Sequence, residues 1–211
     1  MTPAKVRHIF ETLRAANPAP RSELQYRSPF ELLIAVILSA QATDRSVNQA
    51  THALFQRAHT PQAMLELGLR GLKRYIRTIG LYNAKARNIL AACRLLVQLH
   101  DGQVPRQRAE LEALPGVGRK TANVVLNVAF GERTLAVDTH VFRVANRTGL
   151  ARGSNPREVE DELLRTIPDE FMQHAHHWLI LHGRYICTAR RPACPRCPIA
   201  RWCQYPDKTA A

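Results

Sequence analysis

The sequence predicts an all-α protein, because helix start signals recur, strand signals are nearly absent and the segments between expected helices are short. Residues 28–31 read Ser-Pro-Phe-Glu, which combines a capping hydroxyl, a proline at the first helical position and a glutamate at the third. Residues 155–158, Asn-Pro-Arg-Glu, repeat this arrangement. The alternating stretch 134–137 could be extended, but four residues do not make a sheet.

The helices follow in order from apolar periodicity and capping signals. Val6, Ile9, Phe10 and Leu13 share one helical face and predict an amphipathic first helix. Further helices are expected at about 28–40, 44–57, 61–67, 83–99, 107–113, 118–130, 138–149, 155–166 and 172–184. The residues after Cys203 are expected to form a loose tail.

The composition argues against a membrane or secreted protein. The chain has 211 residues, 45% of them hydrophobic, which is enough to bury a core in one or two domains. The longest mainly apolar stretch, 32–40, is far shorter than the roughly 20 residues that span a bilayer. The first thirty residues contain no continuous apolar region of the kind found in signal peptides.

The charge balance favours a polyanionic partner, with nucleic acid as the leading candidate. The formal net charge is +13, from 30 Lys and Arg against 17 Asp and Glu. Residues 67–100 contain seven basic side chains and no acidic one, whereas residues 156–170 contain six acidic side chains. Most of the basic residues are arginines, which suit bidentate phosphate contacts, although a biased genome composition would give the same ratio.

A glycine-rich hairpin is expected between two helices at residues 114–122, Leu-Pro-Gly-Val-Gly-Arg-Lys-Thr-Ala. Gly116 and Gly118 flank one apolar residue after a proline, which allows a tight turn with positive φ. The backbone N–H groups at the following helix start would then form a site for a phosphate. An ordinary helical hairpin with a glycine turn has the same pattern. Residues 79–82, Ile-Gly-Leu-Tyr, faintly repeat 115–118 and suggest a second helix–turn–helix unit.

The cysteines divide into one isolated residue and one cluster. Cys93 lies in an apolar helical stretch and is expected in the core. Four cysteines near the end of the chain favour a metal site over disulfides, since no secretion signal is found. Either Zn²⁺ or a [4Fe–4S] cluster could bind, but a single C-x2-C pair favours the cluster. The candidate ligands are Cys187, Cys194, Cys197 and Cys203.

Taken together, these motifs resemble those of the helix-hairpin-helix DNA glycosylases, and among them the bacterial endonuclease III family. Residues 114–122 look like the family's hairpin, and 136–140, Ala-Val-Asp-Thr-His, look like its catalytic aspartate segment. The cysteines have its C-x6-C-x2-C-x5-C spacing, and 39–44 and 78–83 are also similar. The resemblance covers about residues 5–205.

The resemblance implies a base-excision-repair DNA N-glycosylase that is also an abasic-site lyase. Such an enzyme removes oxidised pyrimidines from duplex DNA and cleaves 3′ to the site by β-elimination through a lysine Schiff base. Lys120 is the expected nucleophile, and desolvation and the adjacent helix N-terminus would both favour its neutral amine. A phosphate-binding or solvated lysine is the simpler reading of this position.

Further site residues are carried over from the same resemblance. Asp138 is expected to stabilise positive charge on the sugar, a role compatible with its simpler reading as a helix N-cap. Gln41 and Leu81 are expected to fill the gap left by an extruded nucleotide. The local pattern alone would place Gln41 in a helix C-cap region and would make Leu81 a buried loop leucine. The expected DNA-binding residues are Gln41, Leu81, Gly116, Gly118, Arg119, His140, Arg190 and Arg191.

The resemblance also implies an architecture of two helical lobes. One lobe would comprise 23–132, with the helix-hairpin-helix motif at about 107–130. The other would combine 1–22 with 133–211 and carry a [4Fe–4S] cluster in the loop 187–203. The expected partner is double-stranded DNA with damaged pyrimidines or abasic sites, bound by a monomer in the bacterial cytoplasm at the nucleoid, without membrane attachment.

Three rival functions share parts of this pattern. Mismatch adenine glycosylases have the hairpin, the aspartate and the cluster, but they lack the lysine at the position of Lys120 and carry an additional C-terminal domain. Thymine-mismatch glycosylases tend to lack the same lysine. A non-catalytic DNA-binding module with a structural metal would fit the charge, the hairpin and the cysteines, and only Lys120 together with Asp138 argues against it.

Overall fold

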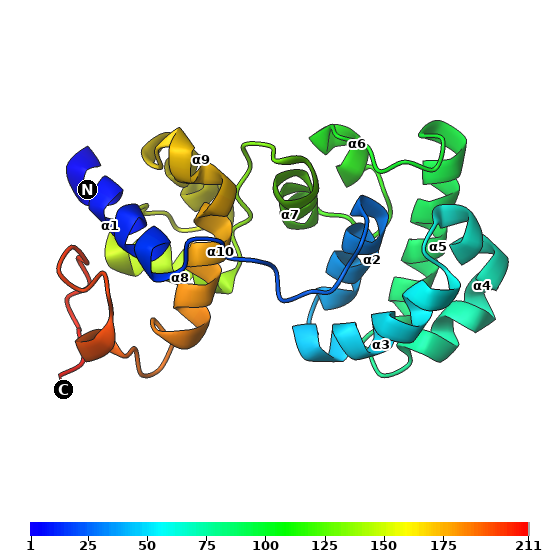
Figure 1. Cartoon of the computed structure of the whole chain (residues 1–211), viewed down its shortest axis with the longest axis horizontal. Coiled ribbons are helices and arrows are strands. Elements are labelled where there is room, and N and C mark those ends of the chain that lie inside the picture. Colours follow the sequence, from blue (N-terminus) through cyan, green and yellow to red (C-terminus); the bar gives the residue numbers. More distant parts are fainter. Residues whose placement is uncertain (211) are drawn as a thin grey trace. The chain divides into compact units, whose positions relative to one another are not determined.

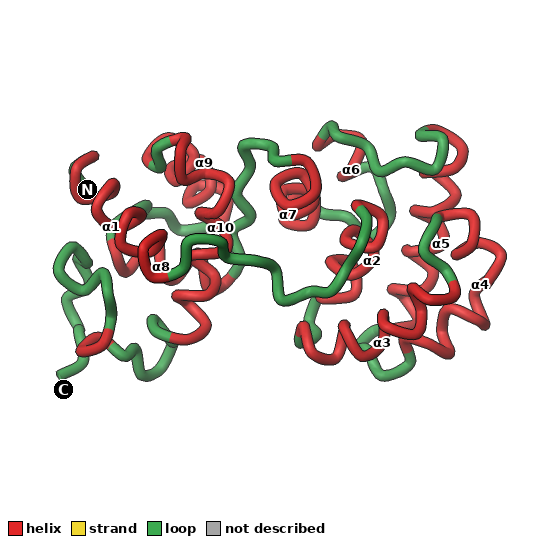
Figure 2. The backbone as a smooth tube through the Cα atoms, viewed as in Figure 1, coloured by secondary structure: helices red, strands yellow, loops and turns green. Residues whose placement is uncertain are grey.

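The computed structural model describes residues 1–210, and all regular structure in them is helical (Figures 1 and 2). The all-α prediction is therefore confirmed for the described chain. The elements are α1 (Pro3–Ala16), α2 (Pro29–Ser39), α3 (Asp44–Arg57), α4 (Pro61–Ile76), α5 (Tyr82–Leu99), α6 (Arg108–Glu112), α7 (Arg119–Phe130), α8 (Thr139–Thr148), α9 (Pro156–Thr166), α10 (Asp169–Tyr185) and a short 3-10 helix, η1 (Cys194–Arg196).

The chain forms two compact units, and one of them is discontinuous in sequence. Ser22–Gly131 makes up the first, called here the hairpin unit. Met1–Arg21 combines with the chain from Glu132 onward to make the second, called here the cysteine unit. None of the helices in the described residues is both long and apolar enough to cross a membrane.

The hairpin unit is built around α2. Every residue of this helix from Phe30 to Leu38 is buried, as expected for a helix that is apolar on all sides. It packs against α3, α5 and α7, while α4 packs against α3 and α5, and α6 packs against α7. Cys93 is fully buried in this core, which confirms its expected place, and burial raises the pKa of its thiol to about 12.

The cysteine unit has its own core, made by α1, α8, α9 and α10. The predicted apolar face of α1 is confirmed, because Val6, Ile9, Phe10 and Leu13 are its buried residues. The Phe10 ring stacks on Phe171 of α10 with ring centroids 5.6 Å apart. The first helix of the chain is thus held by residues about 160 positions away, through aromatic packing.

Most helix bounds agree with the sequence to within three residues, and the main difference lies in α4. The sequence predicts a helix over 61–67, but the structure continues to Ile76 after a break at Gly68, whose φ is 67°. The glycines at 68 and 71 weaken the local helix signal, so the second half of α4 was missed. Its apolar residues Leu72 and Ile76 are fully buried, and tertiary packing stabilises this segment.

Truncating Phe10 tests whether the first helix is part of the cysteine-unit core. Phe10→Ala is expected to lower the free energy of unfolding by about 3–5 kcal/mol, because it removes a fully buried ring and leaves a cavity. Both tryptophans of the chain, Trp178 and Trp202, lie in this unit, so tryptophan fluorescence during urea unfolding reports on it. Lys5→Ala, on the exposed side of α1, is the control and should change stability little. Equal effects of the two substitutions would contradict the packing described.

Candidate functional site

The hairpin joins α6 to α7 through a turn that requires a glycine. The Val117 N–H donates to the Leu114 carbonyl at 3.0 Å, and Gly116, in the third position of this turn, has φ of 83°. A side chain at Gly116 would be strained, and its Cβ would lie 3.0 Å from Cβ of Asn88. Leu114 and Val117 are buried and anchor the turn to the core.

The helix that follows the turn begins without a side-chain cap. Gly118 is the N-cap of α7, and no side chain among the described residues accepts a hydrogen bond there. Lys120, the second residue of α7, has an exposed side chain. An uncapped helix start beside an exposed glycine is a suitable place for an anion, because N–H groups and the helix dipole both face it. The helices with a capping side chain begin instead after Ser28, Thr43, Thr60, Asp138 and Asn155.

Two exposed turns in the hairpin unit carry Gln41 and Leu81. Gln41 has φ of 55° and Leu81 has φ of 59°, a left-handed conformation that costs residues with side chains roughly 1–2 kcal/mol each. Such conformations in residues other than glycine concentrate at functional sites. Leu81 is 65% exposed, so the reading as a buried loop leucine is wrong. Gln41 follows the C-cap of α2, as its simpler reading expected, and it is also exposed.

The same two turns lie next to each other although 40 residues separate them in sequence. A Cβ placed on Gly80, which precedes Leu81, would lie 3.8 Å from the carbonyl oxygen of Gln41. The hairpin unit therefore presents one polar and one apolar side chain from adjacent turns. Periodicity alone did not predict this pairing.

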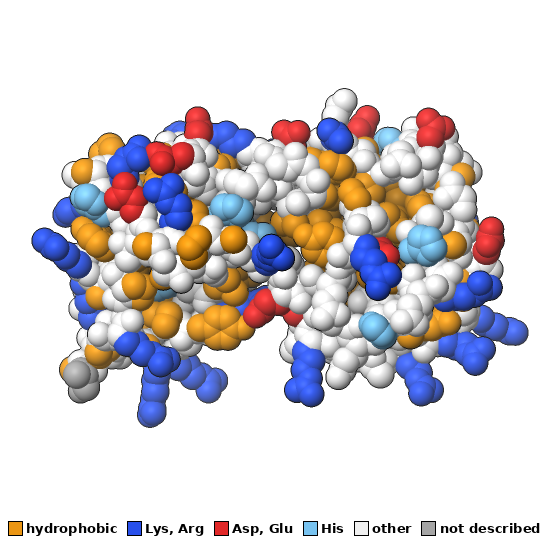
Figure 3. All heavy atoms as spheres, viewed as in Figure 1, with side chains coloured by type: hydrophobic (Ala, Val, Ile, Leu, Met, Phe, Trp, Pro, Cys, Tyr) orange, Lys and Arg blue, Asp and Glu red, His pale blue; other side chains and the backbone are white. Residues whose placement is uncertain are grey.

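The expected basic surface of residues 67–100 requires one correction. Lys85 is buried with 6% exposure, and its amine contacts backbone carbonyls of α2. It therefore does not belong to an anion-facing surface. Figure 3 shows basic side chains projecting from the hairpin unit around α3 and α4. The exposed basic residues of this stretch are Arg70, Arg74, Arg77, Arg87 and Arg94.

Asp138 lies in the cysteine unit and caps α8. Its Oδ1 accepts hydrogen bonds from the N–H groups of His140 at 2.9 Å and Val141 at 2.8 Å, which confirms the expected N-cap. Its Oδ2 has no hydrogen-bond partner among the described residues. The side chain is half-buried and held in one orientation by the helix start. The carboxylate is thus fixed at one oxygen and available at the other.

Two arginines of α8 connect this helix to the cysteine-rich loop. Arg143 donates from Nε to the Cys187 carbonyl at 2.9 Å and from Nη2 to the Gly183 carbonyl at 2.8 Å. Arg147 donates to the carbonyls of Thr188 at 2.7 Å and Ala189 at 2.8 Å. Neither arginine was predicted from the sequence as a site residue. Their spacing of four places them on one face of α8, but the pattern does not distinguish such a pair from a solvated basic face.

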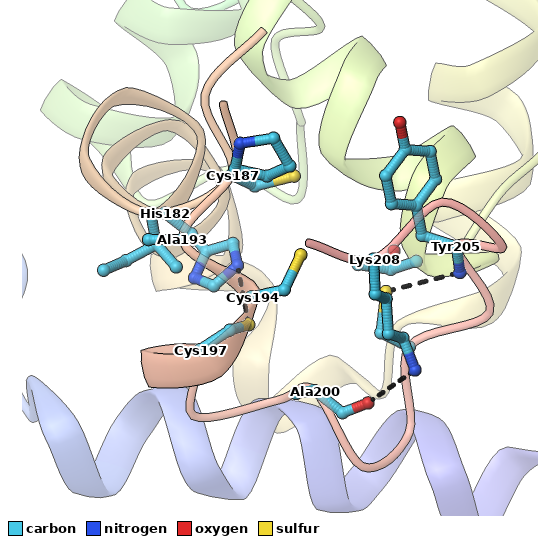
Figure 4. Close-up of a pocket in the computed structure, with 12 residues that line it drawn as sticks. His182, Cys187, Ala193, Cys194, Cys197, Ala200, Tyr205 and Lys208 are labelled. Carbon is cyan, nitrogen blue, oxygen red and sulfur yellow. Dashed lines mark hydrogen bonds between the residues drawn. The ribbon is translucent and has the colours of Figure 1, made fainter. Parts of the chain in front are cut away.

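The four cysteines line a single pocket of the cysteine unit (Figure 4). Arg147 Nη1 lies 3.7 Å from Cys187 Sγ, His182 Nε2 lies 3.6 Å from Cys197 Sγ, and the Tyr205 N–H donates to Cys203 Sγ at 3.5 Å. These contacts place hydrogen-bonding groups around the sulfur atoms. The pocket is also lined by Thr148, Ile186, Pro192, Ala193, Ala200 and Lys208.

The donor set of this pocket fits an iron–sulfur cluster. Burial raises the pKa of the Cys197 thiol to about 11 and also raises the pKa of Cys203, so deprotonated sulfurs here need a positive partner. Burial lowers the pKa of His182 to about 4, so the imidazole beside Cys197 is neutral. No group of three or more His, Cys, Asp or Glu side chains in residues 1–210 is arranged to hold a metal ion directly. Four thiolates are the usual ligands of a [4Fe–4S] cluster.

Arg190 and Arg191 lie between the first two cysteines, and both side chains are exposed. The Thr188 hydroxyl donates to the Arg191 carbonyl at 2.6 Å, which closes this part of the loop. His140 is half-buried at the first turn of α8, and its Nδ1 lies 3.3 Å from Arg143 Nη2. The candidate site residues are thus distributed over both units.

A helical fold with an uncapped glycine hairpin, a helix-capping aspartate and a four-cysteine pocket defines the class of helix-hairpin-helix base excision repair enzymes. Residues 34–169 match the HhH-GPD superfamily of base excision DNA repair proteins. Residues 187–203 match the iron–sulfur binding domain of endonuclease III, and this segment begins and ends at the first and last clustered cysteine. The chain belongs to the endonuclease III family.

Relatives from several bacteria match over nearly the whole chain. Endonuclease III of Escherichia coli strain K12 is 61% identical over 208 residues, which cover 99% of both chains. Endonuclease III of Treponema pallidum is 58% identical over 198 residues, 94% of both chains. A solved structure of a non-covalent endonuclease III–DNA complex matches with a TM-score of 0.90 and 47% identity, covering 97% of this chain and 96% of that chain.

Another solved structure, a trapped endonuclease III–DNA covalent intermediate, matches with a TM-score of 0.89 and 47% identity, over 97% of this chain and 96% of that one. Family membership identifies the chain as a DNA glycosylase and lyase of base excision repair, with a [4Fe–4S] cluster as cofactor. The enzyme prediction and the cofactor prediction are both confirmed. A non-catalytic binding module is excluded.

Two alanine substitutions in the hairpin are expected to differ in their effect on stability. Gly116→Ala should lower the free energy of unfolding by about 1–2 kcal/mol, because φ is positive and the new Cβ would crowd Asn88. Gly118→Ala should change it by less than about 0.5 kcal/mol, because φ is −97° and no atom lies within 4 Å of the added Cβ. Thermal unfolding followed by circular dichroism measures both. A larger loss for Gly118→Ala would contradict the turn geometry.

Loss of a clustered cysteine is expected to release the cofactor and loosen the end of the chain. Cys203→Ser should remove bound iron and visible absorption, and it should expose 187–203 to proteolysis, because this loop has few buried apolar side chains of its own. Iron analysis and limited proteolysis are the measurements. Cys93→Ala is the matched control, since Cys93 lies in the hairpin-unit core. Full iron content in Cys203→Ser would contradict the assignment of this residue to the cluster site.

Proposed function

We propose that the enzyme removes oxidised pyrimidines from duplex DNA and cleaves the strand 3′ to the abasic site by β-elimination, with Lys120 as the nucleophile. The observation that carries the proposal is the exposed Lys120 at the uncapped start of α7, two residues after the hairpin glycine Gly118. A lysine suits this role because its side chain supplies the primary amine from which a Schiff base forms. The structural relative trapped as a covalent DNA intermediate is consistent with such chemistry.

The reaction follows from the chemistry of an amine at the sugar. The neutral Nζ of Lys120 attacks C1′, the bond from C1′ to the damaged base breaks, and the base leaves with the electron pair of that bond. The sugar ring opens to give an iminium on Lys120. Loss of a C2′ proton then expels the 3′ phosphate, and water hydrolyses the imine to restore the lysine. The start of α7 supports the first step, because it presents the Lys120 side chain on the exposed surface.

Asp138 is assigned the stabilisation of positive charge in this reaction. Its Oδ1 is held by two backbone N–H groups, which fixes the carboxylate, while Oδ2 has no partner in the described chain. A negative charge fixed before the reaction stabilises the developing charge on the sugar without having to reorganise. The Asp138 carboxylate is also assigned as the acceptor of the proton that Lys120 must lose before it attacks. The four clustered cysteines are assigned as the ligands of the cofactor, which supplies a covalent link between segments of the loop 187–203.

The DNA contacts are assigned by the position and chemistry of each residue. Gly116, Gly118 and Arg119 are assigned to a backbone phosphate at the start of α7. Extruding a nucleotide costs a few kcal/mol of stacking, and the exposed Gln41 and Leu81 are assigned to the resulting gap. His140, Arg190 and Arg191 are assigned to the DNA strand from the cysteine unit. The enzyme is proposed to act as a monomer on chromosomal DNA in the bacterial cytoplasm.

Borohydride trapping tests the nucleophile and the lesion class together. One duplex would contain a single thymine glycol and the other a single abasic site, and each would be incubated with protein of confirmed iron content. The wild type should form a covalent adduct on both, because borohydride reduces the Schiff base. In Lys120→Ala, the rates of adduct formation and of strand cleavage should both fall by about 10³-fold or more, while DNA binding is retained. Lys5→Ala, with an exposed lysine on α1, is the control.

Each other result has a defined meaning. An adduct on the abasic duplex alone would keep Lys120 as the lyase nucleophile and contradict the assigned lesion class. Strand cleavage retained by Lys120→Ala would contradict the assignment of the nucleophile. No adduct on either duplex would contradict the Schiff-base mechanism as a whole.

A further inference from the structure

Lys85 is a buried lysine that connects two helices of the hairpin unit. It lies on α5, and its side chain is 6% exposed. Its Nζ donates hydrogen bonds to the carbonyl oxygens of Leu38 at 2.9 Å and Ala40 at 2.6 Å, at the end of α2. Burial lowers the pKa of this amine, since removing a charge from water is unfavourable. Because burial of a lysine is unfavourable, its presence in this interior position points to a specific role.

The two hydrogen bonds from the Lys85 side chain satisfy carbonyl groups that α2 leaves without a partner inside the helix. The last four carbonyls of a helix have no partner within it, and they carry its partial negative charge. Leu38 belongs to the last turn of α2, and Ala40 is its C-cap. An amine suits this position because it supplies several donors and a positive charge. The bond to Ala40 also fixes the peptide that leads directly into Gln41.

The backbone of the same residue fixes the second turn. The Lys85 N–H donates to the carbonyl of Leu81 at 3.0 Å, in the first turn of α5. One residue therefore contacts Leu81 through its main chain and the neighbour of Gln41 through its side chain. The two turns have similar hydrogen bonds, because Ala42 N–H donates to Ser39 at 3.1 Å and Tyr82 N–H donates to Ile79 at 3.2 Å.

Both turns hold a side-chain-bearing residue in a left-handed conformation, and such a conformation persists only where the surroundings enforce it. Free turns would relax toward ordinary backbone angles and move the exposed side chains of Gln41 and Leu81 apart. Lys85 lies behind the turns, in the interior, and does not compete with them for DNA.

We propose that Lys85 is a positioning residue for nucleotide extrusion, which holds the turns of Gln41 and Leu81 together so that both side chains enter the DNA in one step. This inference rests on the proposed function, in which those two residues fill the gap in the duplex. Lys85 itself contacts neither DNA nor the reacting sugar. Its effect is expected on substrates that require a base pair to be broken.

The test compares Lys85→Met with the wild type in single-turnover assays. Methionine has similar length and no donor. Cleavage of a fully paired thymine glycol duplex should slow by about 10-fold or more, because the gap-filling side chains are misplaced. Cleavage of a duplex whose abasic site has no opposing base should slow by less than about 3-fold, since no pair is broken. Lys5→Met is the matched control and should affect neither substrate.

Two further measurements separate positioning from a general loss of stability. Amide hydrogen exchange should accelerate at Ala42 and Tyr82 in Lys85→Met and stay unchanged in α7. In a background of Gln41→Ala with Leu81→Ala, Lys85→Met should cause little further slowing, because the residues through which it acts are already truncated. If Lys85→Met slowed cleavage by a further 10-fold in that background, the proposal would be overturned.

A second variant keeps the test decisive if Lys85→Met does not fold. Lys85→Arg retains a cation and hydrogen-bond donors but changes their reach, so it should slow the paired substrate selectively, to a smaller degree than methionine. Equal slowing of both substrates, or no slowing of either, would overturn the role of Lys85. Failure of the proposed function is seen separately, because the wild type would then form no borohydride adduct on the lesion duplex.

Discussion

The satisfaction of backbone groups at helix ends is the constraint on which the rest of this structure depends. All regular structure in residues 1–210 is helical, and every helix leaves N–H groups at its start and carbonyls at its end without partners inside the helix. In the described chain some of these groups are satisfied by short polar caps, by left-handed glycines such as Gly131 and Gly149, or by a buried lysine. The start of α7 is one of those without a side-chain cap, because its N-cap residue, Gly118, has no side chain.

The residues assigned to the reaction are residues of helix ends for a physical reason. Asp138 caps α8, Lys120 lies in the first turn of α7, and Leu81 is the N-cap of α5. At a helix end the helix sets the direction of the backbone, while side chains and unpaired N–H groups still face outward. Such positions combine a fixed geometry with access to a large anionic substrate, which a buried helix face cannot offer.

The loop that carries the cysteines is stabilised differently from the helical cores. It has few buried apolar side chains, and polar contacts from α8 replace them, through Arg143 and Arg147 to its backbone carbonyls. The first of these arginines also reaches the last turn of α10 at Gly183. The helix that begins with Asp138 is therefore the same helix that orders the start of the cofactor loop.

The sequence by itself determined the helical class, most helix bounds, the caps at Ser28 and Asn155, and the burial of Cys93, because periodicity and capping act over a few residues. It also supplied the hairpin and cysteine motifs that define the family. Only the tertiary structure decided that Lys85 is buried against α2 and that Gln41 and Leu81 occupy adjacent left-handed turns. Those features arise from packing between segments about 40 residues apart, and no local pattern encodes which distant carbonyl a lysine will meet.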